Sequence, residues 1–392
     1  GYFMNLLSDL HFKNNALMGI YNHQRVPSSY HDIFEEYKAV RENALLVDYS
    51  HMSITSVMGD DAWALVNYMV SADVSIIRDE QGIYSLLLNA DGDIRGDAYV
   101  LCSADGYYIL SESLTSKEII DVLNEALTKA EELDIQEIPE IKAMEENNWG
   151  AIMLEGPYAW EIMAEVYGFD IIGLPYYEYM NTDDELMIFR CGKHGEFAYQ
   201  LIGPQATLVT MWMKLQEIGA KYLLKTGGLD YQRLVRVENP GWDESLYNNY
   251  SRNPVELQMQ WAIQYDKEDF IGKSAVEELS RKGAERKLVG IAPDVGCSHI
   301  DSNDLVMVNG HQVGVIVKAA YSPAKQHWIA LALIDECYAL ADISGFTIQT
   351  VNGEITAKTQ NVPFIYNLSL LVNPTIHSYV DELKAKSALE TV

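Results

Sequence analysis

The sequence changes its pattern at about residue 286, and this change limits the fold more than any other feature. Before that point, amphipathic helical stretches alternate with apolar, strand-like stretches. After it come short apolar runs with turns at Asn309-Gly310 and Asn352-Gly353, which are typical of β-hairpins. The sequence therefore predicts an α+β chain that ends in a small β-rich domain, joined through the linker "SRKGAERK".

Several elements of the first part can be placed from their patterns. "SSYHDIFEEYKAVRENA" predicts a helix opened by Ser28 and Ser29, and "LLVDYSHMSITSVMG" predicts a strand. "LTSKEIIDVLNEALTKAEEL" predicts an amphipathic helix after a Thr/Ser cap. Its apolar stripe consists of Ile119, Val122, Leu123, Ala126 and Leu127. "IYSLLLNADGDIRGDAYV" predicts a hairpin whose turn holds Asp91 and Asp93.

The charge balance excludes several classes of partner. The chain has 28 basic and 57 acidic residues, a formal net charge of −29. Nucleic acid and anionic membranes both bind clustered Lys and Arg, so neither is expected as a partner. No apolar run reaches 18 residues and no secretory signal pattern opens the chain, so we expect a cytoplasmic protein without a membrane span.

Motifs of the common enzyme classes are absent from the sequence. There is no GxxxxGK[ST], no GxSxG and no HExxH. The four cysteines form no CxxC pair and the nine histidines lack metal-ligand spacing, so no metal site is expected. These observations leave an α+β enzyme or a binding protein.

Several stretches, taken in order, resemble the aminomethyltransferase family, which contains the glycine-cleavage T-protein and the tetrahydrofolate-dependent demethylases. "EEYKAVRENALLVDYSHM" resembles E-x-x-A-V-R…D-x-S-H-M, "GIYSLLLNADGDIRGDAYV" resembles Y-S-x-x-L-N-x-x-G-G-x-x-D-D, and "CGKHGEFAYQLIG" resembles G-Y-T-G-E-x-G-Y-E-I. Further family motifs are similar to "RLVRVENPG", "NPVELQMQWAIQYDKEDFIGKSAV", "VGVIVKAAYSPAKQHWIALALI" and "VPFIY". The order of these stretches over about residues 35–366 carries the resemblance.

The resemblance implies a three-domain, cloverleaf-like arrangement around a central folate channel, with tetrahydrofolate as the cofactor. It places residues 1–52 with 145–225 in a first α+β domain and residues 53–144 with 226–282 in a second. Residues 283–392 form the β-rich domain. The oligomeric state does not follow from the resemblance.

Two folate contacts are implied in the hairpin. Asp97 takes the second place of the D-D motif, and Gly96 takes the first. Asp97 is expected to be catalytic and to contact folate near N5 and N10, where it would steady positive charge. The alternative is that it satisfies the hairpin backbone. Tyr84 matches a folate-contacting tyrosine, although alone it would be a core aromatic residue.

The resemblance implies further folate contacts. Glu196 matches the first glutamate of G-E-x-G-Y-E and Gln200 replaces the second, and the sequence does not decide which of them reads the pterin. Arg236 is expected to hold the folate tail, or else to lie on a solvated face. Trp261 is expected to cover the p-aminobenzoyl ring, or else to be core. Glu112 stands where the family has an asparagine near folate.

Two more groups complete the predicted site. His51, in "DYSHMS", is a candidate catalytic acid or base, with a hydrogen-bonded structural histidine as the alternative. Trp242, Tyr247 and Tyr250 belong to an aromatic-rich stretch near the expected channel mouth. They are expected to shape a substrate pocket, or else simply to pack.

Three departures favour a demethylase or methyltransferase over a T-protein: Gly96 in place of an acid, Gln200 in place of glutamate, and the aromatic stretch from Trp242 to Tyr250. The preferred hypothesis is a tetrahydrofolate-dependent one-carbon transferase that takes a methyl group from a small O-, S- or N-methylated substrate. The acidic composition also counts against an acidic lipoyl carrier protein as a partner. The alternatives are a T-protein that acts on such a carrier and a non-catalytic folate-binding protein.

Overall fold

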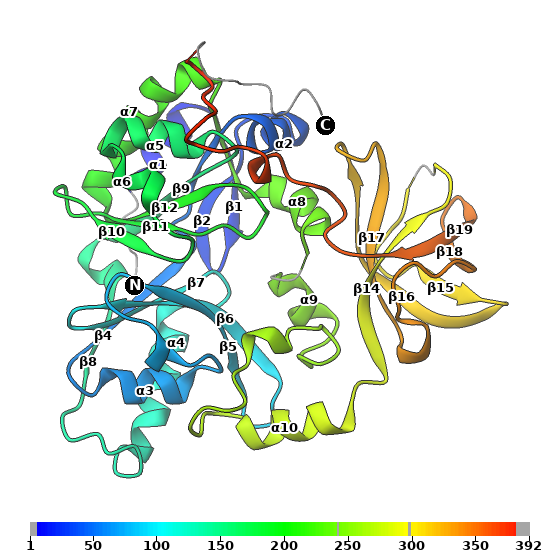
Figure 1. Ribbon diagram of the computed structural model, residues 1–392, viewed down its shortest axis with the longest axis horizontal. Coiled ribbons are helices and arrows are strands. Elements are labelled where there is room, and N and C mark those ends of the chain that lie inside the picture. The colour runs from blue at the N-terminus through cyan, green and yellow to red at the C-terminus, as the bar shows by residue number, and fades with distance from the viewer. Residues whose placement is uncertain (1–5, 241–242, 297–298, 382–392) are drawn as a thin grey trace.

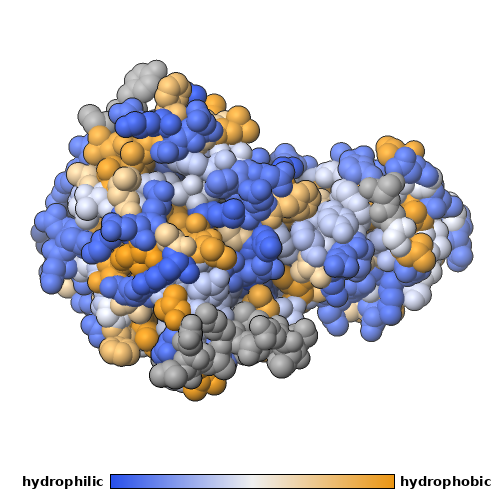
Figure 2. All heavy atoms as spheres, turned by 90° about the horizontal axis from the view of Figure 1, so that it is seen from above, coloured by the Kyte–Doolittle hydropathy of each residue, from blue (hydrophilic) through white to orange (hydrophobic). Residues whose placement is uncertain are grey.

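Two large open sheets, a two-stranded sheet and a closed barrel organise the chain in the computed structural model, which describes residues 6–240, 243–296 and 299–381 (Figure 1). The open sheets occupy the first part, and the barrel follows from residue 286. The predicted α+β class with a C-terminal β-rich domain is therefore confirmed. Figure 2 shows the barrel projecting from the larger body, with hydrophilic side chains over most of the visible face and smaller apolar patches between them.

The first sheet has six strands in the order β10-β11-β12-β9-β3-β13. These strands are β3 (Leu45–Asp48), β9 (Trp149–Glu155), β10 (Tyr179–Asn181), β11 (Met187–Arg190), β12 (Ala198–Pro204) and β13 (Lys225–Gly227). Helices α5 (Ala159–Tyr167) and α7 (Gln205–Gly219) bury their apolar faces against its outer side. A sheet face covered in this way loses its contact with water and stabilises the fold through apolar burial.

The second sheet has five strands in the order β5-β6-β7-β4-β8. These strands are β4 (Ser53–Met58), β5 (Gly82–Leu88), β6 (Ile94–Ser103), β7 (Gly106–Ser111) and β8 (Glu140–Ala143). Helices α3 (Ala62–Met69) and α4 (Ser116–Ala126) cover its outer side. The cap predicted for α4 is present, because Thr115 and Glu118 form a reciprocal capping box.

The inner faces of the two sheets share one apolar core, which we call the central layer. It receives side chains from β3 and β9 of the first sheet and from β5 and β6 of the second. α8 (Gln232–Glu238) also packs into it. The arrangement is therefore helices, sheet, sheet and helices, with the central layer buried between the two sheets. The domain boundaries implied by the resemblance stay a prediction.

The barrel closes in the order β14-β17-β16-β15-β18-β19. Its strands are β14 (Arg286–Pro293), β15 (Leu305–Val308), β16 (His311–Ser322), β17 (His327–Asp335), β18 (Phe346–Thr350) and β19 (Gly353–Gln360). Asn309 and Gly310 both have positive φ, 49° and 79°, which the tight turn between β15 and β16 requires. The predicted linker is shorter than expected, since α10 (Lys273–Lys282) continues through its first residues.

Two predicted elements differ in the structure. The first long helix, α2 (Ile33–Glu42), begins after Asp32, whose side chain accepts from Phe34 N, whereas Ser28 and Ser29 end β2 (Gln24–Ser29). β2 pairs with β1 (Leu17–Tyr21), so the serines serve a hairpin. The single strand predicted around His51 is two strands, β3 and β4, that belong to different sheets. His51 lies at this crossover.

After the barrel, the chain returns across the first sheet unit (Figure 1). Phe364 N donates to Glu238 O at 2.9 Å, and Tyr379 N donates to Glu161 Oε1 at 2.7 Å. This C-terminal segment therefore joins the barrel to α8 and α5. Across the parts of the chain that the structure describes, no helix combines the length and hydropathy of a membrane span.

Candidate functional site

Asp97 lies on the face of β6 that looks into the central layer. Side chains alternate between the two faces of a strand. Tyr99 and Leu101 belong to the central layer, while Ala98 and Val100 pack against the outer helices. Asp97 therefore points between the two sheets, where it is 2% exposed. A carboxylate in such a place needs partners for both its charge and its lone pairs.

Three hydroxyl groups and one ammonium group meet at the Asp97 carboxylate. Tyr84 Oη donates to Oδ2 at 2.7 Å. Ser113 Oγ and Tyr247 Oη donate to Oδ1 at 2.7 and 2.9 Å. Lys193 Nζ lies 3.7 Å from Oδ2. These groups come from β5, the segment after β7, α9 (Glu244–Asn249) and the β11–β12 loop, so both sheets and α9 assemble the site.

Glu112 is a second buried carboxylate beside Asp97. Its Oε2 lies 3.0 Å from Lys193 Nζ, and its Oε1 lies 3.2 Å from Arg236 Nη2. Tyr49 Oη donates to Oε1 at 2.7 Å, and His51 Nε2 lies 3.0 Å from the same oxygen. Glu112 therefore links His51 and Arg236 to the lysine that faces Asp97.

Asp97, Glu112, Lys193 and Arg236, which we call the central cluster, carry a formal charge of zero. Burial alone would raise the pKa of Glu112, but Lys193 and Arg236 hold this pKa well below its usual range. Burial opposes the charge of Lys193, but Glu112 and Asp97 raise its pKa above the ordinary value. Glu112 and Lys193 are thus both ionised at neutral pH. The cluster is a compensated set of charges inside the protein.

Gln200 brings an unsatisfied amide oxygen into the central layer. It stands on β12 between Ala198 and Ile202, whose side chains belong to that layer, and it is 2% exposed. Its Oε1 has no hydrogen-bond partner among the described residues. An unsatisfied buried acceptor costs roughly 1–3 kcal/mol, so a ligand that donates to this oxygen would be stabilised.

Glu196 is occupied by a different network. Its Oε2 accepts from Arg41 Nη1 at 3.0 Å, and its Oε1 accepts from Ser369 Oγ at 2.7 Å. Arg41 Nη2 also donates to Glu238 Oε1 at 2.8 Å. We call Arg41, Glu196 and Glu238 the junction cluster, because it joins α2, α8 and the C-terminal segment. The two candidate pterin readers therefore differ: one is bound within the protein, and the other has an open acceptor.

Trp261 lies at the rim of the site. Its ring stacks on Tyr84 with centroids 5.2 Å apart and an interplanar angle of 21°, and the residue is 54% exposed. Trp261 is thus not a core residue, which removes one of the two expectations for it. Because Tyr84 is buried and bonded to Asp97, the stacked pair leads from the surface to the central cluster.

The aromatic stretch near the expected channel mouth divides in the structure. Tyr247 is 2% exposed and contacts Asp97 directly. Tyr250 is half-buried and donates to Asn303 Oδ1 at 3.1 Å. Trp242 lies outside the described residues. Tyr247 and Tyr250 therefore lie in different surroundings, and a substrate pocket shaped by the aromatic stretch stays a prediction.

A cleft of about 960 Å³ runs between the barrel and the α8–α9 region. Arg236 lines this cleft and also belongs to the central cluster. Arg233, Lys318 and Tyr250 lie along the same cleft. The cleft therefore connects the surface near the barrel with the inner charged residues.

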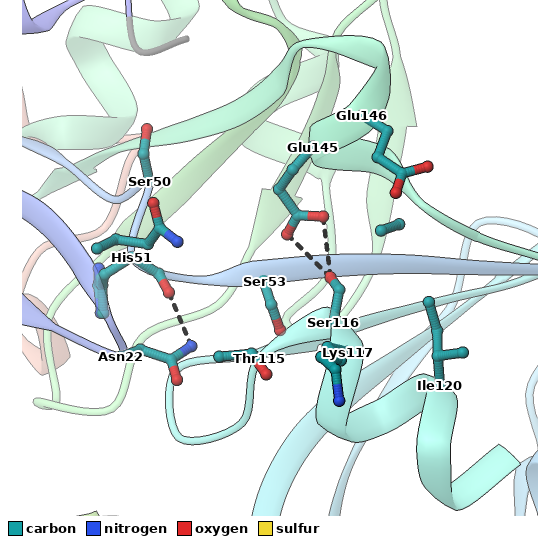
Figure 3. Close-up of a pocket in the computed structure, with 12 residues that line it drawn as sticks. Asn22, Ser50, His51, Ser53, Thr115, Ser116, Lys117, Ile120, Glu145 and Glu146 are labelled. Atoms are coloured by element: carbon teal, nitrogen blue, oxygen red, sulfur yellow. Dashed lines mark hydrogen bonds between the residues drawn. The ribbon is translucent and has the colours of Figure 1, made fainter. Parts of the chain in front are cut away.

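His51 separates the central cluster from another cavity. Its Nε2 faces Glu112, and its Nδ1 has no hydrogen-bond partner among the described residues. Figure 3 shows the neighbouring cavity of about 420 Å³, in which Asn22 donates to the His51 carbonyl and Ser116 faces the carboxylate of Glu145. His51 reaches Asp97 through Glu112 and Lys193, so a catalytic role for His51 stays a prediction.

Packing against Leu114 explains why glycine and not an acid precedes Asp97. A Cβ atom at Gly96 would lie 2.6 Å from Cγ of the buried Leu114, much closer than carbon atoms approach. An acidic side chain at this place would require Leu114 to move. The missing acid at Gly96 therefore says nothing about the donor of the one-carbon group.

Sequence reasoning missed Lys193, Ser113 and His194. His194 Nδ1 lies 2.9 Å from Glu155 Oε2, and its Nε2 accepts from Arg236 Nε at 3.1 Å. Burial lowers the pKa of His194 despite Glu155. Lys193 and His194 stand where the G-Y-T-G-E motif has tyrosine and threonine. These two adjacent departures from the motif are the signal that could have revealed them.

Comparison with known proteins decides the family. The family model described as the GCVT N-terminal domain matches residues 7–267, and the model of the glycine cleavage T-protein C-terminal barrel domain matches residues 286–365. The chain belongs to the glycine-cleavage T-protein family. The resemblance noted in the sequence is thereby confirmed.

Individual relatives of this T-protein family member agree in name. A protein named aminomethyltransferase from Halothermothrix orenii is 28% identical over 367 residues, which are 92% of this chain and 99% of the relative. Another from Caldanaerobacter subterraneus subsp. tengcongensis is 28% identical over 341 residues, 85% of this chain and 88% of the relative. The crystal structure of the glycine cleavage system aminomethyltransferase T from Bartonella henselae shares the fold, with a TM-score of 0.77, 21% identity, and coverage of 93% and 98%.

The preferred demethylase hypothesis is wrong. Relatives that match this T-protein family member over nearly their whole length are named aminomethyltransferase, which supports the alternative and not the transfer of a methyl group from a small methylated substrate. Two of the departures that favoured the demethylase have roles in packing and in the site. Gly96 accommodates Leu114, and Tyr247 is a buried partner of Asp97.

Proposed function

We propose that this chain is an aminomethyltransferase that moves a one-carbon unit from a lipoyl carrier protein to tetrahydrofolate. The observation that carries the proposal is the Asp97 carboxylate, held by three hydroxyl groups and faced by Lys193 in the central layer. A preorganised carboxylate in a water-poor site stabilises positive charge that develops on a transferred carbon. The names of the relatives supply the reaction class.

The described residues fit tetrahydrofolate. The open Oε1 of Gln200 would accept from the amino-pyrimidinone edge of the pterin. Trp261, stacked on Tyr84, would offer a flat surface to an aromatic ring of the folate. Arg236, at the inner end of the cleft, pairs with Glu112 and with the partly exposed Glu244, and the carboxylates of the folate tail would take the place of Glu244. Gln200 is preferred over Glu196 as the pterin reader because the Glu196 oxygens already bind Arg41 and Ser369.

Tetrahydrofolate would supply the nucleophilic nitrogen atoms, and the chain would supply position and charge. Tyr84, Tyr247 and Ser113 hydrogen-bond the Asp97 carboxylate, so its lone pairs are satisfied in the buried site before charge develops. In the overall reaction, the carbon–sulfur and carbon–nitrogen bonds of the aminomethyl group break and two carbon–nitrogen bonds to folate form. The two protons that leave the folate nitrogens are taken up by the thiolate and the amine.

A lipoyl carrier protein must dock on a chain that carries a net charge of −29. An acidic carrier would be repelled over most of the surface. Local positive charge would then guide docking, and Arg233, whose side chain is 69% exposed, offers such charge at the cleft, whereas Lys318 is already paired with Asp243. Carrier-dependent turnover should therefore respond to the ionic strength of the assay.

The proposal is tested by incubating the protein with tetrahydrofolate and a lipoylated carrier protein loaded with the aminomethyl group. We expect 5,10-methylene-tetrahydrofolate and ammonia to form in equal amounts, and only with the loaded carrier. A carrier without its lipoyl group is the control. Folate binding without turnover would identify a non-catalytic folate-binding protein, and no folate binding in a titration would contradict the proposal as a whole.

A further inference from the structure

Lys193 joins the two sheets at the centre of the site. It belongs to the loop between β11 and β12 of the six-stranded sheet, whereas Asp97 lies on β6 of the five-stranded sheet and Glu112 follows β7. Its Nζ is 3.0 Å from Glu112 Oε2 and 3.7 Å from Asp97 Oδ2. The Lys193 side chain is 7% exposed. Its ammonium group is therefore held in one place between two carboxylates.

Aromatic rings enclose the same ammonium group. Nζ lies 5.9 Å from the ring centroid of Tyr84 and 5.8 Å from that of Tyr99. Rings at this distance attract a cation through their negative faces. Tyr84 also donates to Asp97 Oδ2, the oxygen that Lys193 faces. The positions of Tyr84, Lys193 and Asp97 are therefore coupled.

The other partners of Asp97 differ from Lys193 in kind. Ser113, Tyr84 and Tyr247 are neutral hydroxyl donors, and hydroxyl groups rotate to suit their acceptor. Lys193 provides a full charge. Without it, Glu112 would keep Arg236 as a counter-ion, but Asp97 would lose the cation that faces it. A buried carboxylate that loses its counter-ion must move, attract water or bind a proton.

We propose that Lys193 is a positioning residue of the transfer site, which holds the Asp97 carboxylate in its working orientation. Lys193 acts through Asp97 and not on the transferred carbon. Its kinetic effect rests on the proposed function, whereas its effect on the position of Asp97 does not. Lys193 comes from the six-stranded sheet and Asp97 from the five-stranded sheet. The transfer site is therefore complete only where the two sheets pack together.

Kinetics of three variants test the proposal. Lys193→Met should lower kcat about 100-fold and change KM for tetrahydrofolate less than about threefold, because orientation matters most in the transition state. Lys193→Arg keeps the charge and should stay within about tenfold of the original kcat. Lys38→Met, an exposed lysine on α2 with a side chain 72% exposed, is the control and should change neither constant.

The double variant K193M/E112Q separates positioning from folding. It removes one charge of each sign, so it should unfold closer to the wild-type temperature than Lys193→Met does. Its kcat should nevertheless stay about 100-fold low, because Asp97 still lacks Lys193. Recovery of kcat in the double variant would overturn the proposal, since Lys193 would then only neutralise Glu112.

A crystal structure of the K193M/E112Q variant gives a readout that needs no activity. We expect the Asp97 carboxylate to turn, so that the 2.7 Å contact between Tyr84 Oη and Asp97 Oδ2 is lost. An unchanged Asp97 in this variant would overturn the proposal whatever the kinetics show. If the wild-type protein transfers no carbon from the loaded carrier, the proposed function fails while this crystallographic result still decides the role of Lys193.

Discussion

The central cluster and the junction cluster are both buried sets of arginine and carboxylates, yet they differ in what their oxygen atoms contact. In the junction cluster, Glu196 binds Arg41 and Ser369, and Glu238 accepts from Tyr37 Oη at 2.6 Å. Arg41 and Tyr37 belong to α2 and Ser369 to the C-terminal segment, which are elements that the junction cluster joins. In the central cluster, Asp97 is held by hydroxyl groups and lies in the same layer as the unsatisfied oxygen of Gln200. An open acceptor in the layer that holds the central cluster favours a ligand site there, whereas the fully bonded junction cluster favours a structural role.

The charge sums of the two clusters also differ. The central cluster is neutral, while the junction cluster sets one arginine against two glutamates. Burial raises the pKa of Glu196, and Arg41 offsets this only in part. Glu112 shows the opposite result, because Lys193 and Arg236 outweigh burial and lower its pKa. The neighbouring cations therefore outweigh burial at Glu112 but not at Glu196.

The largest expected effect comes from Asp97→Asn in the central cluster. Asparagine keeps the shape but loses the negative charge, so kcat should fall about 100- to 1000-fold. The dissociation constant for tetrahydrofolate should change less than about threefold, because Gln200 and Trp261 remain. Transfer kinetics and a folate titration measure the two quantities. A variant that keeps more than a tenth of kcat would mean that Asp97 is structural and that the two clusters do not differ in function.

The matching change in the junction cluster is Arg41→Met. It leaves Glu196 and Glu238 buried without their shared cation, which should cost about 3–5 kcal/mol of unfolding free energy. Folate affinity should stay within about twofold. Urea unfolding and a folate titration below the unfolding midpoint check this. The triple variant R41M/E196Q/E238Q should regain most of the stability, and failure to do so would show that Arg41 acts through packing.

A smaller effect is expected from Gln200→Leu. It removes the open acceptor, so the dissociation constant for tetrahydrofolate should rise about 5- to 30-fold, which corresponds to about 1–2 kcal/mol. Stability should not fall, because the unsatisfied oxygen disappears as well. Gln205→Leu is the control: this buried glutamine accepts from Leu6 N at 2.8 Å and should leave folate affinity unchanged. Equal folate affinity of Gln200→Leu and wild type would remove Gln200 as the pterin reader.

The part of the site that could be predicted lies within one hairpin. Alternation and strand pairing place Tyr84 opposite Tyr99 and Leu86 opposite Asp97, so Tyr84 and Asp97 share a face and their contact follows from local sequence. Two hairpins of the barrel are predictable for the same reason, since the turns between β15 and β16 and between β18 and β19 are short and carry Asn-Gly. Local geometry is thus readable from the sequence without knowing the packing.

The rest of the site depends on how the sheets pack. Lys193, Tyr247 and Arg236 approach Asp97 and Glu112 from segments that are distant in the sequence, and periodicity alone does not show which of them meet. For the same reason, the sequence alone does not decide whether Glu196 or Gln200 reads the pterin. That choice depends on Arg41 and Ser369, which come from α2 and from the segment after the barrel.

The smallest expected effect, and the one that most directly compares the two clusters, is the pH dependence of stability. The folded-state pKa of Glu112 lies below the ordinary value of about 4.3, so its contribution is present at neutral pH and is lost as the pH falls through that lowered pKa. The folded-state pKa of Glu196 is raised, so its contribution to stability is present at acidic pH and is lost as the pH rises through that raised pKa.

Urea midpoints of wild type, Glu112→Gln and Glu196→Gln between pH 3 and 7 measure both contributions. The advantage of wild type over Glu112→Gln should shrink below pH about 4, whereas its stability relative to Glu196→Gln should increase as the pH falls from neutral. Slopes of the same sign would mean that the pKa values of Glu112 and Glu196 shift in the same direction, and the two clusters would then differ only in the open acceptor of Gln200.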